Sequence, residues 1–203
     1  MKDKIKIWWI LFAVLFIALI ILIPKSKSKQ KYKSGSPIST TLPYNFRTEK
    51  AERLSIMAFD LRKEKKYNEA INLYRQAINK EPDNPRLFFD LSECYTSTNN
   101  PEKAISLLDT AIILDSSCAA FYNNRGLIYW HLYKDENAIN DYKKAIQLDS
   151  SKWYFYSNLS LAYYANKKVL DACKMFKIAK RLGLDITLKE TDQNLKKIEK
   201  ICR

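Results

Sequence analysis

The chain repeats itself at an interval of 34 residues, and this period constrains its fold more than any other feature. The segment Ala111-Ile-Ile-Leu-Asp-Ser-Ser117 returns as Ala145-Ile-Gln-Leu-Asp-Ser-Ser151. Extending the frame in both directions predicts four units, at 51–84, 85–118, 119–152 and 153–186. A fixed period of about 20 to 50 residues is typical of an array in which each unit packs against its neighbours.

Each unit carries two patterns of apolar and small residues at offsets of three, four and seven, which place them on one face of a helix. In the first pattern the columns across the four units are Leu54, Phe88, Tyr122, Tyr156; Met57, Leu91, Arg125, Leu159; Ala58, Ser92, Gly126, Ser160; and Leu61, Tyr95, Tyr129, Tyr163. In the second they are Ala70, Ala104, Ala138, Ala172; Tyr74, Leu108, Tyr142, Phe176; and Ala77, Ala111, Ala145, Ala179. Three glycines are too few for the hairpin turns of an all-β fold.

Unit three reads Tyr122-x-x-Arg-Gly-x-x-Tyr129, followed by Ala138-x-x-x-Tyr142. Apart from Arg125, this resembles the W-x-x-L-G-x-x-Y…A-x-x-x-F signature of the tetratricopeptide-repeat (TPR) family. The other units match with conservative changes, and the resemblance covers 51–186. It implies an all-α fold, a right-handed α-solenoid of four helix hairpins, whose first helices line a concave groove that binds a protein or peptide partner.

The family's late proline is present as Pro82 but is replaced by Ser116, Ser150 and Leu184 in the other units. At the two unit ends that carry serine, we expect Asp-Ser-Ser to supply N-cap oxygens for the next helix. Asn84 has the same expected role before Pro85.

The last segment, 187–203, is predicted to be a helix that caps the array. Its apolar stripe would cover the exposed face of the last unit; the stripe consists of Leu188, Leu195, Ile198 and Cys202. Cys202 and Cys173 would meet if this helix folds back on its neighbour, and the sequence leaves their pairing open. No two cysteines have the C-x-x-C spacing of a zinc or redox site.

The N-terminal segment 1–24 is predicted to be a transmembrane anchor with a basic flank. From Ile7 to Ile23 it carries no charge over 17 residues, with Trp8 and Trp9 at one end. This length approaches the thickness of a bilayer core, and tryptophan prefers its interface. A cleaved signal peptide is the alternative, although no Ala-x-Ala follows. The following residues, 25–50, are predicted to be a flexible basic linker.

Most of the net charge of +13 lies in this N-terminal quarter, where Met1–Lys50 holds 10 Lys and Arg against 2 Asp and Glu. The repeats carry mixed signs, so we expect no nucleic-acid partner. Lysines cluster directly after the apolar run, which favours a cytoplasmic TPR domain in a single-pass membrane protein. The opposite orientation, facing the cell envelope, stays open.

Ten side chains on the first helices, on the face opposite the apolar columns, are predicted to form the peptide-binding groove. They are Phe89, Asp90, Asn123, Asn124, Leu127, Trp130, His131, Asn158, Leu161 and Tyr164. Asp90, Asn124 and Asn158 share one column, and asparagine amides can both donate to and accept from a peptide backbone. The simpler interpretation is that asparagine is a tolerated polar residue on a solvated face.

The chaperone-binding TPR subfamily holds a terminal carboxylate with a lysine and an asparagine, and Ser55 and Phe59 stand at those positions here. That clamp is therefore not expected.

A catalytic role is not expected either. His131 is the only histidine, and no glycine-rich phosphate loop is present. We therefore expect no enzyme activity, no cofactor and no metal site. The predicted function is a membrane-tethered scaffold or adaptor that binds a peptide segment of a partner protein. The alternatives are a structural component that assembles through repeat-end or self-association contacts, and an envelope-facing TPR protein.

Overall fold

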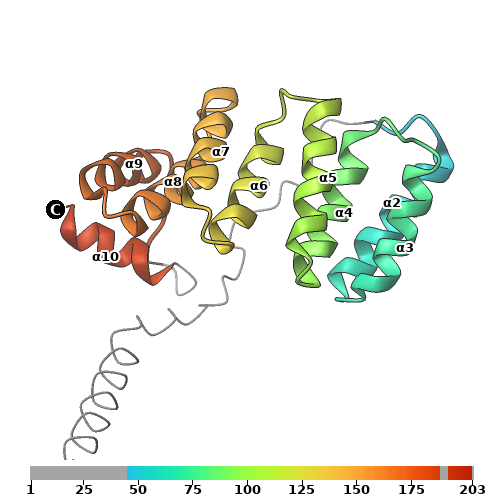
Figure 1. Ribbon diagram of the computed structural model, residues 1–203, viewed down its shortest axis with the longest axis horizontal. Coiled ribbons are helices and arrows are strands. Elements are labelled where there is room, and N and C mark those ends of the chain that lie inside the picture. The colour runs from blue at the N-terminus through green and yellow to red at the C-terminus, as the bar shows by residue number, and fades with distance from the viewer. Residues whose placement is uncertain (1–44, 188–191, 203) are drawn as a thin grey trace, which may run out of the picture. The chain divides into compact units, whose positions relative to one another are not determined.

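A computed structural model describes residues 45–187 and 192–202, which contain nine α-helices and no β-strand (Figure 1). They are α2 (Glu49–Lys63), α3 (Tyr67–Ile78), α4 (Pro85–Ser97), α5 (Pro101–Leu114), α6 (Ala119–His131), α7 (Asp135–Leu148), α8 (Trp153–Ala165), α9 (Val169–Arg181) and α10 (Gln193–Ile201). The predicted anchor 1–24, linker residues 25–44 and Leu188 lie outside the described residues. Within the described ranges, no helix is both long and apolar enough to cross a bilayer.

The helices pair as hairpins in chain order, and the prediction of an all-α fold is confirmed. α2 packs with α3, α4 with α5, α6 with α7 and α8 with α9, and each second helix also packs on the first helix of the next pair. The first helices α4, α6 and α8 begin at Pro85, Ala119 and Trp153, at 34-residue intervals. Along the ribbon, the hairpins follow one another from α2 to α9 (Figure 1).

Small residues are buried where helices approach closely. Ala70, Ala104, Ala138 and Ala172 are fully buried in the second helices. Gly126 of α6 shows why size matters there, because a Cβ atom at this position would lie 2.9 Å from Cε1 of Tyr142 and 3.2 Å from Cβ of Asp141. The repeated alanine and glycine positions therefore allow the large neighbours to pack closely.

Arg125, the charged residue in an apolar column, is accommodated by two aspartates. Its Nε and Nη2 donate to the two carboxylate oxygens of Asp141 at 2.8 and 2.7 Å, and its Nη1 donates to Asp109 at 2.6 Å. These hydrogen bonds raise the pKa of Arg125. The cluster joins α5, α6 and α7, so a charged network replaces the apolar contact that leucine makes in other units.

The helix starts differ from one another in their capping. Asn84 caps α4 as predicted, since its Oδ1 accepts from the backbone N of Arg86 at 3.2 Å. The expected capping by Asp-Ser-Ser is wrong. Asp115 Oδ1 instead accepts from the backbone N and Oγ of Ser117 at 2.8 and 2.6 Å, and Asp149 does the same with Ser151. Each aspartate is bonded within the turn in which it lies. This turn is too far from the following helix for the aspartate to reach the first backbone amides of that helix.

The C-terminal helix α10 packs on α8 and α9. Leu195 and Ile198 are buried there, in a cluster with Phe176 and Leu184. The cysteine pairing that the sequence left open is formed, because Cys173 of α9 and Cys202 are joined by a disulfide with their Cα atoms 5.4 Å apart. α10 therefore covers the last hairpin through apolar contacts, and the disulfide links the two covalently.

Candidate functional site

The ten residues of the predicted groove differ widely in exposure. Buried residues are Phe89, Asp90, Asn123, Leu127, Asn158 and Leu161; partly buried residues are Asn124, Trp130 and Tyr164; His131 is exposed. All ten lie on α4, α6 and α8. Among these three first helices, α6 and α8 also contact each other directly.

Two of the predicted asparagines form a buried pair between neighbouring units. Asn158 Nδ2 of α8 donates to Asn123 Oδ1 of α6 at 2.9 Å. The third, Asn124, donates from Nδ2 to the backbone oxygen of Ala120 at 2.9 Å, within its own helix. The structure thus joins Asn158 to Asn123 and not to Asn124, with which it shares a sequence column.

Aromatic residues lie on either side of this amide pair along the chain. Trp130 and Tyr164 pack against the apolar cluster that contains Leu161. Trp130 also lies beside His131, with ring centroids 6.0 Å apart. On α4, Phe89 packs against Phe121 with ring centroids 5.5 Å apart. Phe89 and Phe121 are buried, so only the partly exposed Trp130 and Tyr164 offer apolar contact area near the amides, a combination common at protein-binding surfaces.

The α4 part of the site is ionic. Asp90 accepts a hydrogen bond from Arg86 Nε at 3.2 Å, and Glu93 forms an ion pair with Arg62 of α2. Burial raises the pKa of Asp90 above its usual value and that of Glu93 to about 7, against the opposing effect of the arginines. Neither Arg62 nor Glu93 is among the ten predicted groove residues, and the repeat period does not predict that they pair.

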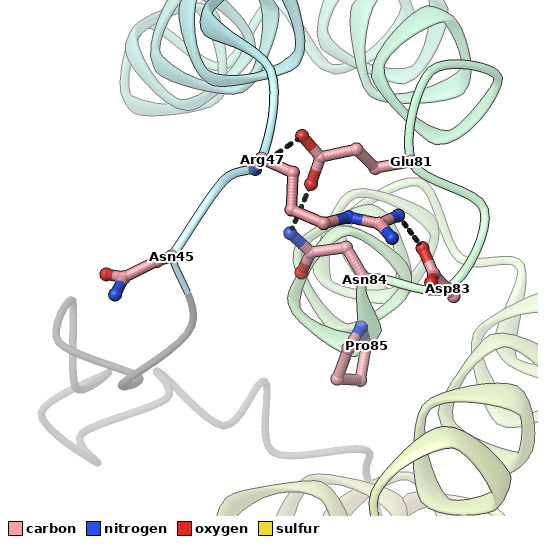
Figure 2. Close-up of a pocket in the computed structure, with 6 residues that line it drawn as sticks. All are labelled: Asn45, Arg47, Glu81, Asp83, Asn84 and Pro85. Carbon is pink, nitrogen blue, oxygen red and sulfur yellow. Dashed lines mark hydrogen bonds and ion pairs between the residues drawn. The ribbon is translucent and has the colours of Figure 1, made fainter.

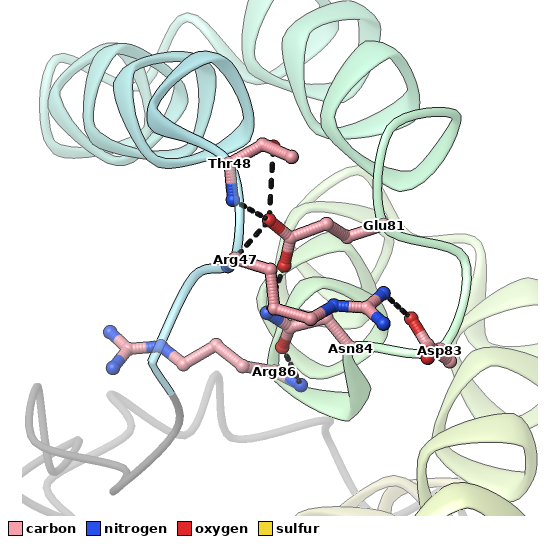
Figure 3. Close-up of polar contacts among 6 residues, drawn as sticks. All are labelled: Arg47, Thr48, Glu81, Asp83, Asn84 and Arg86. Carbon is pink, nitrogen blue, oxygen red and sulfur yellow. Dashed lines mark hydrogen bonds and ion pairs between the residues drawn. The ribbon is translucent and has the colours of Figure 1, made fainter.

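A second polar cluster surrounds Glu81 in the turn between α3 and α4, and sequence reasoning missed it. Glu81 Oε1 accepts from the backbone nitrogens of Arg47 and Thr48 at 2.8 and 2.7 Å and from Thr48 Oγ1 at 3.0 Å, while Oε2 accepts from Asn84 Nδ2 at 3.0 Å (Figure 3). Burial alone would raise the pKa of Glu81, but these hydrogen bonds lower it overall. Thr48 is the N-cap of α2, so Glu81 fastens the start of α2 to this turn.

A surface pocket lies beside Glu81, and Figure 2 shows its lining. It is formed by Asn45, Arg47, Glu81, Asp83, Asn84 and Pro85. Arg47 forms an ion pair with Asp83, and Asn45 points away from the other side chains (Figure 2). Because Glu81 is bonded to Asn84 and to backbone nitrogens, and Asp83 is paired with Arg47, we assign this cluster a structural role. Elsewhere in the described chain, no group of His, Cys, Asp and Glu is arranged to hold a metal ion.

Comparison with known families supports the sequence resemblance. One model, described as a tetratricopeptide repeat, matches residues 61–123, and a second, described as a TPR repeat, matches residues 134–167. Comparison with curated protein sequences found no match.

Several solved structures share the fold. A MamA protein is 21% identical, with a TM-score of 0.60, over 66% of this chain and 73% of that one. The pilF protein of Pseudomonas aeruginosa is 21% identical, with a TM-score of 0.63, over 66% of this chain and 62% of that one. The first TPR of Spaghetti (RPAP3), bound to the HSP90 peptide SRMEEVD, is 27% identical, with a TM-score of 0.56, over 58% of this chain and 94% of that one.

The 34-residue period, the paired helices, the two family matches and the structural neighbours agree with one another. Two parts of the helical array, residues 61–123 and 134–167, thus match tetratricopeptide-repeat models, and the array as a whole is similar to that family.

Proposed function

We propose that the protein is a non-catalytic scaffold that binds an extended peptide segment of a partner protein across α4, α6 and α8. The observation that carries this proposal is the buried Asn158–Asn123 hydrogen bond between two first helices. Burying amides costs free energy that apolar residues would avoid, so their use here favours a role beyond packing. An asparagine amide can exchange such a bond for the N–H and C=O groups of a peptide backbone.

The Spaghetti (RPAP3) domain supports the peptide-binding part of this proposal, because it was solved with a bound peptide. The clamp for a terminal carboxylate is not carried over. Ser55 is buried, and Phe59 is covered by Arg62 and Lys63, whose charged groups lie 5.1 and 4.2 Å from its ring centroid. The proposed ligand is therefore an internal segment of a partner and not its C-terminus.

The test is selection of peptides from a phage-displayed library on the full-length chain, followed by affinity measurement with variants. We expect Asn158→Ala to weaken the selected peptide about tenfold, the effect of losing a hydrogen bond in a desolvated site. Asn140→Ala is the matched control, since Asn140 is exposed on the second helix α7 and should leave affinity unchanged. If wild type and Asn158→Ala bind the selected peptide with equal affinity, the proposed site is wrong.

We further propose that Ile7–Ile23 tethers the scaffold to a membrane. Its support is the uncharged length of this segment and the tryptophan pair at its start. Tethering would raise the effective concentration of the repeats near a membrane-bound partner. If the full-length chain leaves the membrane fraction on alkaline carbonate extraction, the tether proposal fails.

A second candidate is that the protein is an envelope-facing TPR protein, and the Cys173–Cys202 disulfide favours this alternative. Disulfides persist in oxidising compartments and are rare in the cytosol, whereas the lysines after the apolar run favour a cytoplasmic domain. Protease protection of a C-terminally tagged full-length chain separates the two. Digestion only from the cytoplasmic side supports a cytoplasmic adaptor, and digestion from outside supports an envelope protein. Recovery of a shortened soluble chain means that the apolar run is a signal peptide.

A further inference from the structure

The exposed charged residues of the last two helices are all basic. On α9 and α10 they are Lys174, Lys177, Lys180, Arg181, Lys197 and Lys200. The two acidic residues of these helices are only partly exposed, and each is paired: Asp171 lies 3.8 Å from Lys174, and Glu199 lies 2.9 Å from Lys180. The other four basic side chains form no ion pair with a described residue. We call the exposed residues of α9 and α10 the basic end of the array.

The exposed charges of the other helices balance one another. On α2 three acidic and three basic residues are exposed; they are Glu49, Glu52, Asp60, Lys50, Arg53 and Lys63. α3, α5 and α7 each expose one acidic and one basic residue, and α4, α6 and α8 expose no Asp, Glu, Lys or Arg. The excess of positive charge on the helices is therefore a property of the basic end and not of the array as a whole.

The turns beside these two helices do not reverse this balance. Lys167 and Lys168 are exposed before α9, and Lys168 lies 3.9 Å from Glu136 of α7. Asp185 and Asp192 lie between α9 and α10, and each accepts a hydrogen bond from a backbone nitrogen, at 2.8 and 2.6 Å. The described residues 167–187 and 192–202 hold nine Lys and Arg against four Asp and Glu.

Exposed apolar side chains lie among these basic residues. Leu170 of α9 is 79% exposed, and Ile201 of α10 is 52% exposed. Leu170 lies three residues before Cys173, and Ile201 directly precedes Cys202, so the disulfide between α9 and α10 brings the two apolar residues to the same part of the surface (Figure 1). An exposed lysine lies four residues from each of them, on the same face of its helix. Both helices therefore expose an apolar and a basic side chain together.

We propose that the basic end binds the surface of a bilayer that contains anionic lipids. Clusters of lysine and arginine are attracted to anionic headgroups. The side chains of Leu170 and Ile201 can enter the boundary between headgroups and acyl chains, where their burial adds to the attraction. A nucleic acid fits this surface less well, because none of the exposed residues of α9 and α10 is aromatic and able to stack on a base.

Co-sedimentation of the full-length chain with lipid vesicles tests the proposal. Every protein in the test carries Leu15→Asp and Leu19→Asp, because two carboxylates in the apolar run should prevent its insertion, and binding then reports on the rest of the chain. We expect this background chain to bind vesicles of phosphatidylcholine and phosphatidylserine in equal parts more tightly than vesicles of phosphatidylcholine alone. The result depends neither on the proposed tether nor on the proposed peptide site.

Charge reversal at the basic end should weaken binding to the mixed vesicles. We expect Lys177→Glu with Lys197→Glu to weaken it about tenfold or more, because both lysines are exposed and each reversal replaces an attraction by a repulsion. Lys50→Glu with Lys80→Glu is the matched control, since these exposed lysines lie outside α9 and α10 and the net charge changes equally. Lys177→Gln with Lys197→Gln should cause a smaller loss, and circular dichroism verifies that each variant is folded.

The apolar residues distinguish a bilayer from a soluble acidic partner. Leu170→Ser with Ile201→Ser should weaken binding to the mixed vesicles about threefold or more, because less apolar surface is then buried at the headgroup boundary. The same variant should bind soluble polyglutamate as the background chain does, since its charge is unchanged.

Three results would overturn the proposal. The first is a background chain that does not bind the mixed vesicles. The second is an equal loss in the Lys177 and Lys197 variant and in its Lys50 and Lys80 control, which would show that net charge governs binding. The third is full vesicle binding by Leu170→Ser with Ile201→Ser while the lysine variant loses both vesicles and polyglutamate, which would assign the basic end to an acidic protein.

Discussion

The two ends of the repeat array are built in opposite ways. At the N-terminal end, α2 presents Ile56 and Met57 to solvent. At the C-terminal end, α10 buries Leu195 and Ile198 against the last hairpin, and a disulfide holds it there. In a repeat array, each terminal unit exposes the apolar face that an inner unit would bury against its neighbour, unless another segment covers it. In this chain α10 covers the last hairpin, whereas two apolar side chains of the first helix remain exposed.

The same substitution at the two ends should separate these roles most strongly. Ile198→Ala removes a nearly inaccessible side chain from the cap and should lower the free energy of unfolding by about 2–5 kcal/mol. Ile56→Ala removes an exposed side chain and should change it by less than about 0.5 kcal/mol. Denaturant unfolding of the full-length proteins, followed by circular dichroism, measures both. Equal effects would show that the two ends do not differ in stabilising contacts.

The covalent part of the C-terminal end should have the next largest effect. Cys173→Ser opens a disulfide that spans 29 residues of sequence, which should lower the free energy of unfolding by about 2–4 kcal/mol. Reductant should destabilise the wild type by a similar amount and leave Cys173→Ser unaffected. If reductant has no effect on an oxidised wild type, α10 is held by its apolar contacts alone.

The first two hairpins should respond to pH through a buried carboxyl group on α4. Glu93 beside Arg62 has its pKa raised to about 7 by burial, so the folded protein holds this proton more firmly than the unfolded chain does. Stability should therefore fall by about 1–3 kcal/mol as pH rises from near 4.5 to 7. Glu93→Gln should flatten this part of the stability profile measured by denaturant unfolding. The lowered pKa of Glu81 acts in the other direction, since its contribution is lost as pH falls below about 4.5.

A sloping profile that persists unchanged in Glu93→Gln would contradict the assignment to this carboxyl. Asp90 then becomes the next candidate, because burial also raises its pKa.

The helices of this chain could be predicted from the sequence, but the contacts between their side chains could not. The period and the columns of small residues identify the helices, since these positions are set by packing within and between successive units. Contacts between side chains on different helices depend on the stagger of those helices, which the period does not contain. Arg125 illustrates this: its partners Asp109 and Asp141 each lie 16 residues away, on the helices to either side.

The candidate site shows the same limit. A strict 34-residue column places Asn158 with Asn124, but the hydrogen bond joins Asn158 to Asn123, 35 residues away. Arg62 and Glu93 pair at a separation of 31. A shift of one or a few residues leaves the helices in register with the repeat while changing which polar groups meet. The repeat period therefore places these polar residues on the first helices, but it does not predict which of them bond to each other.

The smallest expected effect concerns a surface ion pair at the C-terminal end. Lys180 Nζ of α9 lies 2.9 Å from Glu199 of α10, with the two side chains 43% and 21% exposed. Exposed pairs gain little, because water screens the attraction and ordering two long side chains costs entropy, so Glu199→Gln should lower the free energy of unfolding by less than about 1 kcal/mol. The loss should shrink further at high salt. Denaturant unfolding at low and high salt measures both quantities. A loss as large as that of Ile198→Ala, persisting in salt, would show that charge and not apolar burial holds the cap in place.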